Sequence, residues 1–195
     1  MTDEGERALE AAVVILAPPE VAAFVESFRA RYLNSENQLI PAHITVLYPF
    51  VSPGTVATGP DSDVIVAAGV RLGQACREAA PFTVTLDHYA TFPTGGVLFL
   101  APQDPAPIVA LQQHLQAAFP EYPPYGGLYA DFIPHMTLGF FENRERLEAA
   151  PRPTFAPFTF RVETLHFLYG DFTIPQRWTT AAIVPLGGET RDHAG

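Results

Sequence analysis

The sequence contains no lysine, one cysteine and no long hydrophobic run. Its 195 residues include 11 basic and 21 acidic side chains, a formal net charge of −10 at pH 7, and every basic residue is an arginine. Binding along an extended nucleic acid normally needs a basic face, so no long nucleic acid is expected as a partner. A local pocket can still hold a small phosphorylated ligand.

The other absences bear on compartment and on metal content. The single cysteine, Cys76, excludes a disulfide within the chain and a cysteine metal cluster. No apolar stretch reaches the roughly 18–20 residues that a membrane span needs. The N-terminal segment MTDEGERALE lacks the apolar core of a signal peptide. We therefore expect a cytoplasmic protein without a membrane partner.

Enough apolar material is present for a core, and its pattern repeats along the chain. Hydrophobic residues make up 48% of the sequence, and their periodicity predicts alternating strands and helices. Three landmarks occur twice in the same order: Leu-Ala-Pro at 16–18 and 100–102, His-x-Thr at 43–45 and 135–137, and Pro-Phe-Thr at 81–83 and 157–159. This order indicates a duplicated strand–helix–strand–helix–strand unit.

The duplication predicts an α/β (α+β) fold with pseudo-two-fold symmetry. We expect a single bilobal domain over 1–195, in which two antiparallel-rich sheets surround a central cleft and the helices lie outside. The lobes are expected to come from about 12–90 and 97–185, with flexible tails at 1–10 and 187–195. The protein is expected to be a monomer.

The two His-x-Thr segments supply the candidate catalytic residues His43, Thr45, His135 and Thr137. Residues i and i+2 of a strand share a face and lie roughly 6.6–6.8 Å apart, so each segment presents an imidazole and a hydroxyl together. If the halves meet about the pseudo-axis, both sets converge on one cleft. Two imidazoles with pKa values near neutrality supply a general base and a general acid at the same pH. The hydroxyls can donate to phosphate oxygens.

Three more residues are candidates for substrate binding. Gly139 follows Thr137 on the same face by strict alternation and would leave room under a ligand. Phe141 is predicted either to stack on a base or to join the core. Tyr125, beside Gly126-Gly127 in a proline-rich loop, is predicted to form a lid or base-stacking wall, or to anchor the loop.

A zinc site is a rival interpretation of the histidine pair. Zinc takes three or four ligands from His, Cys or carboxylate side chains. Neither His-x-Thr segment has an Asp, Glu or Cys nearby on the same face. The sequence therefore predicts neither a metal ion nor another cofactor.

The motif regions resemble the two-histidine (2H) phosphoesterase superfamily, and best its bacterial 2′-5′ RNA ligase family. Residues 41–50, Pro-Ala-His-Ile-Thr-Val-Leu-Tyr-Pro-Phe, are similar to the first family motif and its flank. The segment 119–127, Phe-Pro-Glu-Tyr-Pro-Pro-Tyr-Gly-Gly, leads to Pro-His-Met-Thr at 134–137 and is similar to the second. The resemblance spans about residues 12–185.

The resemblance implies a metal-independent phosphodiesterase that acts on 2′,3′-cyclic phosphates or 2′-5′ linked nucleotides. It also implies that His43 is the general acid and His135 the general base, and hydrolysis is expected rather than RNA ligation. The absence of lysine favours a small nucleotide or a short RNA end as substrate. The alternative is a module that binds a phosphorylated nucleotide without turning it over, although such a module does not need two imidazoles at one phosphate.

Overall fold

The computed structural model describes residues 7–32, 40–128, 131–171 and 178–187. Helices and strands alternate along most of this length. In chain order they are β1 (Glu10–Leu16), α1 (Pro19–Tyr32), β2 (His43–Leu47), β3 (Gly54–Thr55), β4 (Gly59–Pro60), α2 (Ser62–Cys76), β5 (Phe82–Thr91), β6 (Val97–Pro102), α3 (Ala106–Ala118), the 3-10 helix η3 (Pro124–Gly127), β7 (Met136–Phe140), α4 (Arg144–Ala149), β8 (Phe158–Val162), β9 (Thr164–Gly170) and β10 (Thr179–Pro185).

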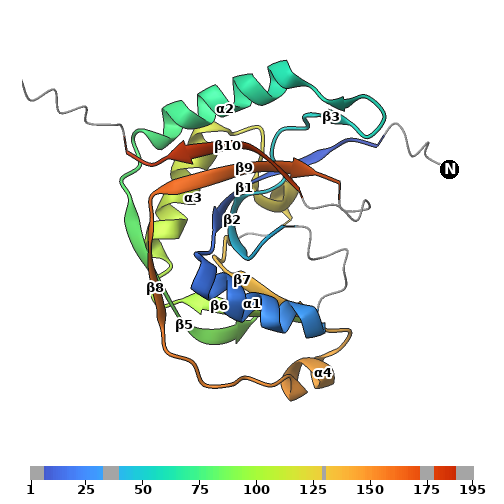
Figure 1. Ribbon diagram of the computed structural model, residues 1–195, viewed down its shortest axis with the longest axis vertical. Helices are drawn as coiled ribbons and strands as arrows, with labels where there is room; N and C mark the ends of the chain where they lie inside the picture. The colour runs from blue at the N-terminus through green and yellow to red at the C-terminus, as the bar shows by residue number, and fades with distance from the viewer. Residues whose placement is uncertain (1–6, 33–39, 129–130, 172–177, 188–195) are drawn as a thin grey trace, which may run out of the picture.

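Two four-stranded antiparallel sheets form the body of the molecule. The first sheet has the order β10-β9-β1-β2 and the second has the order β7-β6-β5-β8. In Figure 1 the first sheet and α2 occupy the upper half of the view, and β5, β6 and β7 lie in the lower half with α1. The predicted fold class, two antiparallel sheets with helices outside them, is confirmed.

Each sheet takes strands from both of the expected lobes. We expected one lobe from 12–90 and the other from 97–185, but β5 lies between β6 and β8 in the second sheet, and β9 and β10 complete the first. The short connection through Gly95-Gly96 keeps β5 beside β6, because consecutive antiparallel strands pair most readily as a hairpin. The two strands of the Pro-Phe-Thr landmark, β5 and β8, therefore pair with each other instead of holding equivalent places.

The helices also cross between the halves. Helix α1, which follows β1, packs against β7 of the second sheet, and α3, which follows β6, packs against β2 of the first. Both β2 and β7 are edge strands of their sheets, and they contact each other. The two His-x-Thr strands therefore meet at the junction of the two sheets, each supported by the helix of the other half.

Strand β1 is buried on both faces. Val13 and Ile15 belong to the main hydrophobic core, whereas Ala12 and Val14 belong to a smaller cluster with Trp178. A strand covered on both sides can be apolar at every position, which explains the unbroken hydrophobic run of this segment.

The described part of the expected N-terminal tail belongs to the fold. Arg7 donates through Nε and Nη2 to one carboxylate oxygen of the buried Asp171, at 3.0 and 2.7 Å. The N–H of Leu9 donates to the carbonyl of Gly54 at 2.8 Å, and β1 already begins at Glu10. The flexible tail was expected to extend to residue 10, but Arg7, Leu9 and Glu10 already belong to the fold.

Two glycines give a matched test of packing. A Cβ added at Gly170 would lie 2.4 Å from Cδ1 of Trp178, whereas one added at Gly73 in α2 would meet nothing within 4 Å. We expect Gly170→Ala to lower the free energy of unfolding by about 1–3 kcal/mol through overpacking. Gly73→Ala should raise it by roughly 0.5–1 kcal/mol, because alanine is the better helix former. Urea unfolding of both variants measures these changes. Equal changes of the same sign in the free energy of unfolding of the two variants would contradict the prediction.

Candidate active site

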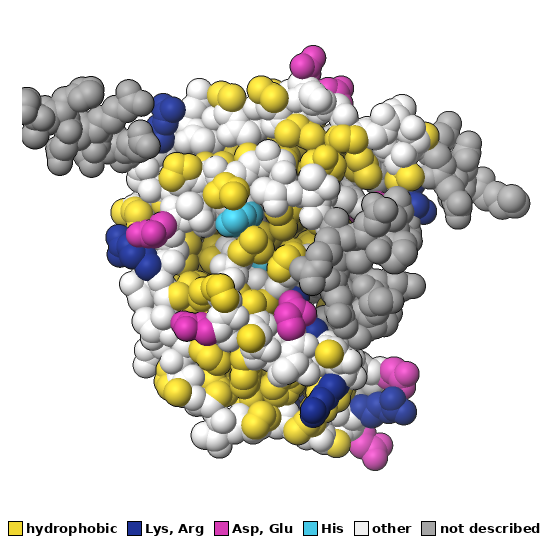
Figure 2. All heavy atoms as spheres, viewed as in Figure 1, with side chains coloured by type: hydrophobic (Ala, Val, Ile, Leu, Met, Phe, Trp, Pro, Cys, Tyr) yellow, Lys and Arg dark blue, Asp and Glu magenta, His cyan; other side chains and the backbone are white. Residues whose placement is uncertain are grey.

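The two His-x-Thr segments have the same pattern of exposure. His43, Thr45, His135 and Thr137 are all half-buried, and the residues between and after them are buried. The predicted alternation is therefore present in both strands, with the imidazole and the hydroxyl on one face and the apolar side chains in the main core. Figure 2 shows histidine side chains in a hollow between the upper and lower halves of the view, among hydrophobic side chains.

Both strands carry a β-bulge at the same motif position. The ladder between β1 and β2 skips Val46, and the ladder between β6 and β7 skips Leu138. These residues directly follow Thr45 and Thr137. The shared bulge supports the structural equivalence of the two motifs, and bulges of this kind often occur next to active sites, where they redirect side chains.

Each motif imidazole is anchored by a backbone carbonyl two residues before it. Nδ1 of His43 lies 2.7 Å from the carbonyl oxygen of Pro41, and Nδ1 of His135 lies 2.8 Å from that of Ile133. A carbonyl oxygen can only accept, so Nδ1 carries the hydrogen in both rings. Nε2 is then the nitrogen that can take or give a proton.

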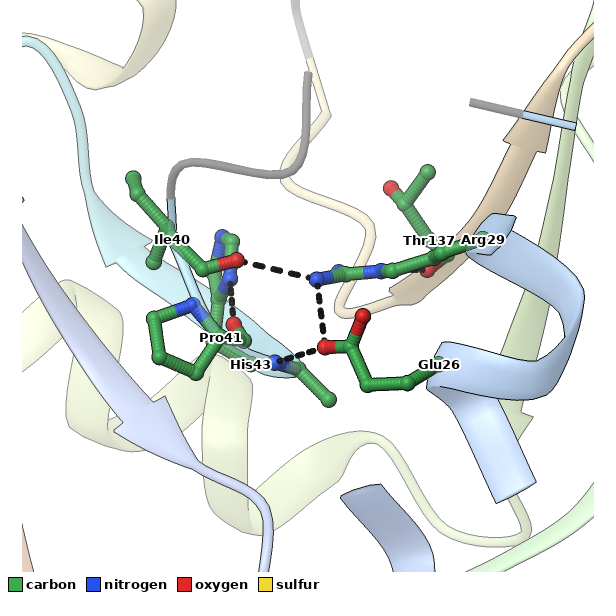
Figure 3. Close-up of polar contacts among 7 residues, drawn as sticks. Glu26, Arg29, Ile40, Pro41, His43 and Thr137 are labelled. Atoms are coloured by element: carbon green, nitrogen blue, oxygen red, sulfur yellow. Dashed lines mark hydrogen bonds and ion pairs between the residues drawn. The ribbon is translucent and has the colours of Figure 1, made fainter. Parts of the chain in front are cut away.

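A buried arginine joins the two motif regions. The Nε of Arg29 donates to the carbonyl of Thr137 in the second motif at 3.0 Å, and its Nη1 donates to the carbonyl of Ile40, just before the first motif, at 3.0 Å. The side chain is 2% exposed. Glu26, one turn earlier in α1, lies 3.5 Å from Nη1 and accepts the N–H of Ala42 at 3.1 Å (Figure 3).

The surroundings of both motif histidines disfavour the charged imidazolium. Burial lowers the pKa of His43 to about 3, and the positive charges of Arg29 and of a protonated His135 add to this, while the carbonyl of Pro41 opposes it. Burial also lowers the pKa of His135, against the effect of the Ile133 carbonyl. We expected values near neutrality, and burial places both lower. An anionic phosphate beside the rings would raise them.

Two phenylalanines flank the second motif histidine. The ring centroids of Phe92 and Phe99 lie 4.9 and 5.3 Å from that of His135, and 4.7 Å from each other. Phe99 is buried on β6 and pairs with Thr137, whereas Phe92 is half-buried just after β5. Sequence spacing gives no signal for these contacts, because Phe92 lies more than 40 positions before His135.

A third histidine shares the sheet face of the first motif. Val14 pairs with Thr45 on one side and with His166 of β9 on the other, so the three side chains point the same way. Two strand spacings separate Thr45 from His166 by about 10 Å. The Nδ1 of His166 is buried without a hydrogen-bond partner among the described residues, and burial lowers the pKa of this imidazole.

Two of the predicted substrate-binding residues pack against a helix. The bulge in β7 places Gly139 opposite Leu98 of the core, so strict alternation gave it the wrong face. A Cβ added at Gly139 would lie 2.6 Å from the Cβ of Tyr32 in α1, and the ring of Phe141 lies 5.2 Å from that of Tyr32. The close approach that requires glycine is therefore made by α1, and substrate contact by Gly139 and Phe141 stays a prediction.

Tyr125 is fixed to the end of the first motif strand. Its N–H donates to the carbonyl of Tyr48 at 2.6 Å, and the two rings meet edge to face with centroids 6.3 Å apart. Tyr125 also lines a cavity of about 320 Å³ together with Gln112 and Gln116 of α3. The structure thus shows a loop anchor, and Tyr125 borders a cavity.

Neither a metal cluster nor a membrane segment is found in the described part of the chain. Within the described ranges no group of three or more His, Cys, Asp and Glu side chains is arranged to hold a metal ion. No helix in these ranges is long and apolar enough to cross a membrane.

Two sheets each bring one histidine–threonine strand to a common junction, which fits the resemblance to the two-histidine phosphoesterases. The chain belongs to the 2′-5′ RNA ligase superfamily, whose family model matches residues 17–171.

Sequence relatives carry a phosphoesterase name. A Geobacillus kaustophilus (strain HTA426) protein named "Putative phosphoesterase" is 28% identical over 133 residues, which are 65% of this chain and 66% of that protein. A Geobacillus thermodenitrificans (strain NG80-2) protein of the same name is 26% identical over equal shares. The matched region thus spans just under two thirds of each relative.

Solved structures share the fold over nearly the whole chain. Escherichia coli LigT in its apo form has a TM-score of 0.56 and 19% identity, covering 93% of this chain and 99% of LigT. A Thermus thermophilus protein has a TM-score of 0.59 and 20% identity, covering 92% and 99%. LigT has also been solved with 3′-AMP, with a TM-score of 0.56, 18% identity and coverage of 93% and 100%.

The lowered pKa of His43 predicts that the stability of the protein depends on pH. The pKa of His43 is about 6.5 in the unfolded chain and about 3 in the folded protein, so between these pH values the unfolded chain binds more protons at this residue. The free energy of unfolding therefore falls as pH drops from 6.5 towards 3. One such group contributes a slope of at most about 1.4 kcal/mol per pH unit. Urea unfolding between pH 5 and 7 should show a shallower slope for His43→Gln, whereas Thr45→Val, which removes no titratable group, should keep the wild-type slope. A wild-type slope in His43→Gln would contradict the assignment.

Proposed function

We propose that the protein is a metal-independent phosphodiesterase that acts on 2′,3′-cyclic phosphates or 2′-5′ linked nucleotides, as free nucleotides or short RNA ends. The observation that carries this proposal is the pair of imidazoles anchored through Nδ1 on equivalent strands that contact each other. Each ring keeps Nε2 for proton transfer, so the pair can act on both sides of one phosphorus atom.

The proposed hydrolysis uses one imidazole on each side of the phosphate. One neutral imidazole accepts a proton from water at Nε2 while the water oxygen forms a bond to phosphorus. The other, protonated imidazole donates the Nε2 proton to the ribose oxygen as the bond from phosphorus to that oxygen breaks. The product is a phosphomonoester beside a free hydroxyl, and solvent restores the two protonation states. The family resemblance assigns the acid to His43 and the base to His135.

The threonine hydroxyls are proposed to bind the non-bridging phosphate oxygens. Thr45 and Thr137 lie one strand step beyond the imidazoles on the same face and are half-buried. Hydroxyl donors held in place before the reaction stabilise the charge that develops on these oxygens. No lysine is present to add a second phosphate contact, in keeping with a small substrate.

Further support for a nucleotide substrate comes from the relatives. LigT has been solved with 3′-AMP, with ATP and with NADP+. In this chain the half-buried ring of Phe92 beside His135, and that of Tyr125 next to the end of β2, are suitable for contact with a base. A monomeric state and a cytoplasmic location stay predictions.

Loss of either imidazole tests the proposal. His43→Ala and His135→Ala should each lower kcat on 2′,3′-cyclic nucleotides at least about a hundredfold, because each removes one proton-transfer group. The assay contains EDTA, and wild-type turnover should persist in it. His114→Ala is the matched control, since His114 lies on α3 and contacts the carbonyl of Ala75 in α2. Nucleotide binding without turnover by the wild type would favour the binding-module alternative.

Removal of the two threonine hydroxyls should lower the activity, although both motif imidazoles stay in place. Thr45→Val and Thr137→Val keep the shape of the side chain and should lower kcat by about 10–1,000-fold. Thr159→Val is the control, because Thr159 is exposed on β8, at the sheet edge opposite β7. Wild-type kcat in both motif variants would remove the threonines from the mechanism.

A further inference from the structure

We propose that Arg29, with Glu26, is a positioning residue that holds the two His-x-Thr strands at a fixed separation. This inference rests on the proposed function, because it concerns the same site. Arg29 lies in neither His-x-Thr motif, and no sequence pattern of the site points to it.

The hydrogen bonds of Arg29 connect both motifs across the sheet junction. Nε holds the carbonyl of Thr137 inside β7, and Nη1 holds the carbonyl of Ile40, three residues before His43, both at 3.0 Å. The planar guanidinium fixes the angle between these two donors. A shift of either strand would therefore break a bond to a buried cation, which is costly to leave unpaired.

Glu26 extends the connection to the residue before the first histidine. Its Oε1 accepts the N–H of Ala42 at 3.1 Å and lies 3.5 Å from Nη1 of Arg29 (Figure 3). Arg29 therefore holds the backbone carbonyl of Ile40, and Glu26 holds the backbone N–H of Ala42, in the segment that leads to His43. In the second motif the corresponding contact from α1 is the bond of Arg29 to the carbonyl of Thr137.

Arg29 does not contact substrate in this arrangement. It is 2% exposed, and its described hydrogen bonds go to backbone carbonyls and to Glu26. Its influence on the reaction must therefore pass through the strands that carry His43 and His135. The expected consequence is a change in kcat that exceeds the change in KM.

The charge of Arg29 also affects His43. It is among the causes that lower the pKa of His43, and its Nη1 bonds the carbonyl of Ile40, three residues before that histidine. The other groups around His43 are Glu26 on α1, the carbonyl of Pro41 and the imidazole of His135, while its β1 neighbour Leu16 is apolar. An anionic phosphate counteracts the cation and therefore raises the pKa of His43.

Three variants separate positioning from charge. Arg29→Lys keeps the cation and loses the fixed fork, so kcat should fall at least about tenfold while the NMR titration of the His43 ring stays as in the wild type. Arg29→Met loses both, so kcat should fall at least as far and the His43 titration should move to higher pH. Glu26→Gln keeps an acceptor for Ala42 and should cost less than either. In all three, kcat should change more than KM.

Arg71→Met is the matched control, because Arg71 also bonds a carboxylate, that of Glu121, and a carbonyl, that of Ala118, but joins α2 to the end of α3. It should leave kcat and the His43 titration unchanged. Wild-type kcat in Arg29→Lys would overturn the positioning role, and an unmoved His43 titration in Arg29→Met would overturn the electrostatic role. If Arg29→Met does not fold, Arg29→Lys and Glu26→Gln still test positioning.

The titration needs no substrate, so it distinguishes this inference from the proposed function. If the wild type hydrolyses none of the cyclic nucleotides, the proposed function fails while the His43 titration still reports on Arg29. If the wild type is active and the Arg29 variants behave like the wild type, only the inference fails.

Discussion

The register between two edge strands from different sheets is the constraint on which the rest of the structure depends. β2 and β7 contact each other at the sheet junction, but among the described residues no ladder of backbone hydrogen bonds joins them. One buried guanidinium, that of Arg29, instead holds the carbonyl of Thr137 inside β7 and the carbonyl of Ile40 before β2. Because a buried cation is stable only with its partners in place, the position of one strand depends on the position of the other.

Exchange of elements between the halves reinforces this junction. Each motif strand is packed by a helix that follows an inner strand of the other sheet. Helix α1 follows β1 and packs on β7, and α3 follows β6 and packs on β2. β5, β9 and β10 complete the sheets across the midpoint of the chain. Neither half therefore contains a complete site or a complete sheet, and the pseudo-symmetric motifs meet only when the whole fold forms.

Sequence periodicity was sufficient for the fold class and for the face that the motif residues share, because strand alternation depends only on local geometry. It did not predict β9, although Thr164–Gly170 is a strand, and it placed Gly139 on the wrong face, because a bulge is set by pairing with a neighbouring strand. Arg29 and Phe92 were also missed. Both reach the site through contacts between segments far apart in sequence, and neither has a spacing that marks it.

We propose that two Nε2 atoms, one from each half, face the same phosphorus atom. A crystal structure with a nucleoside vanadate, which mimics five-coordinate phosphorus, measures this directly. We expect one vanadate between the rings, with Nε2 of His43 and Nε2 of His135 each within hydrogen-bond distance, about 2.6–3.2 Å, of a different apical oxygen. A vanadate bound by only one of these imidazoles, or bound outside the junction of β2 and β7, would contradict it.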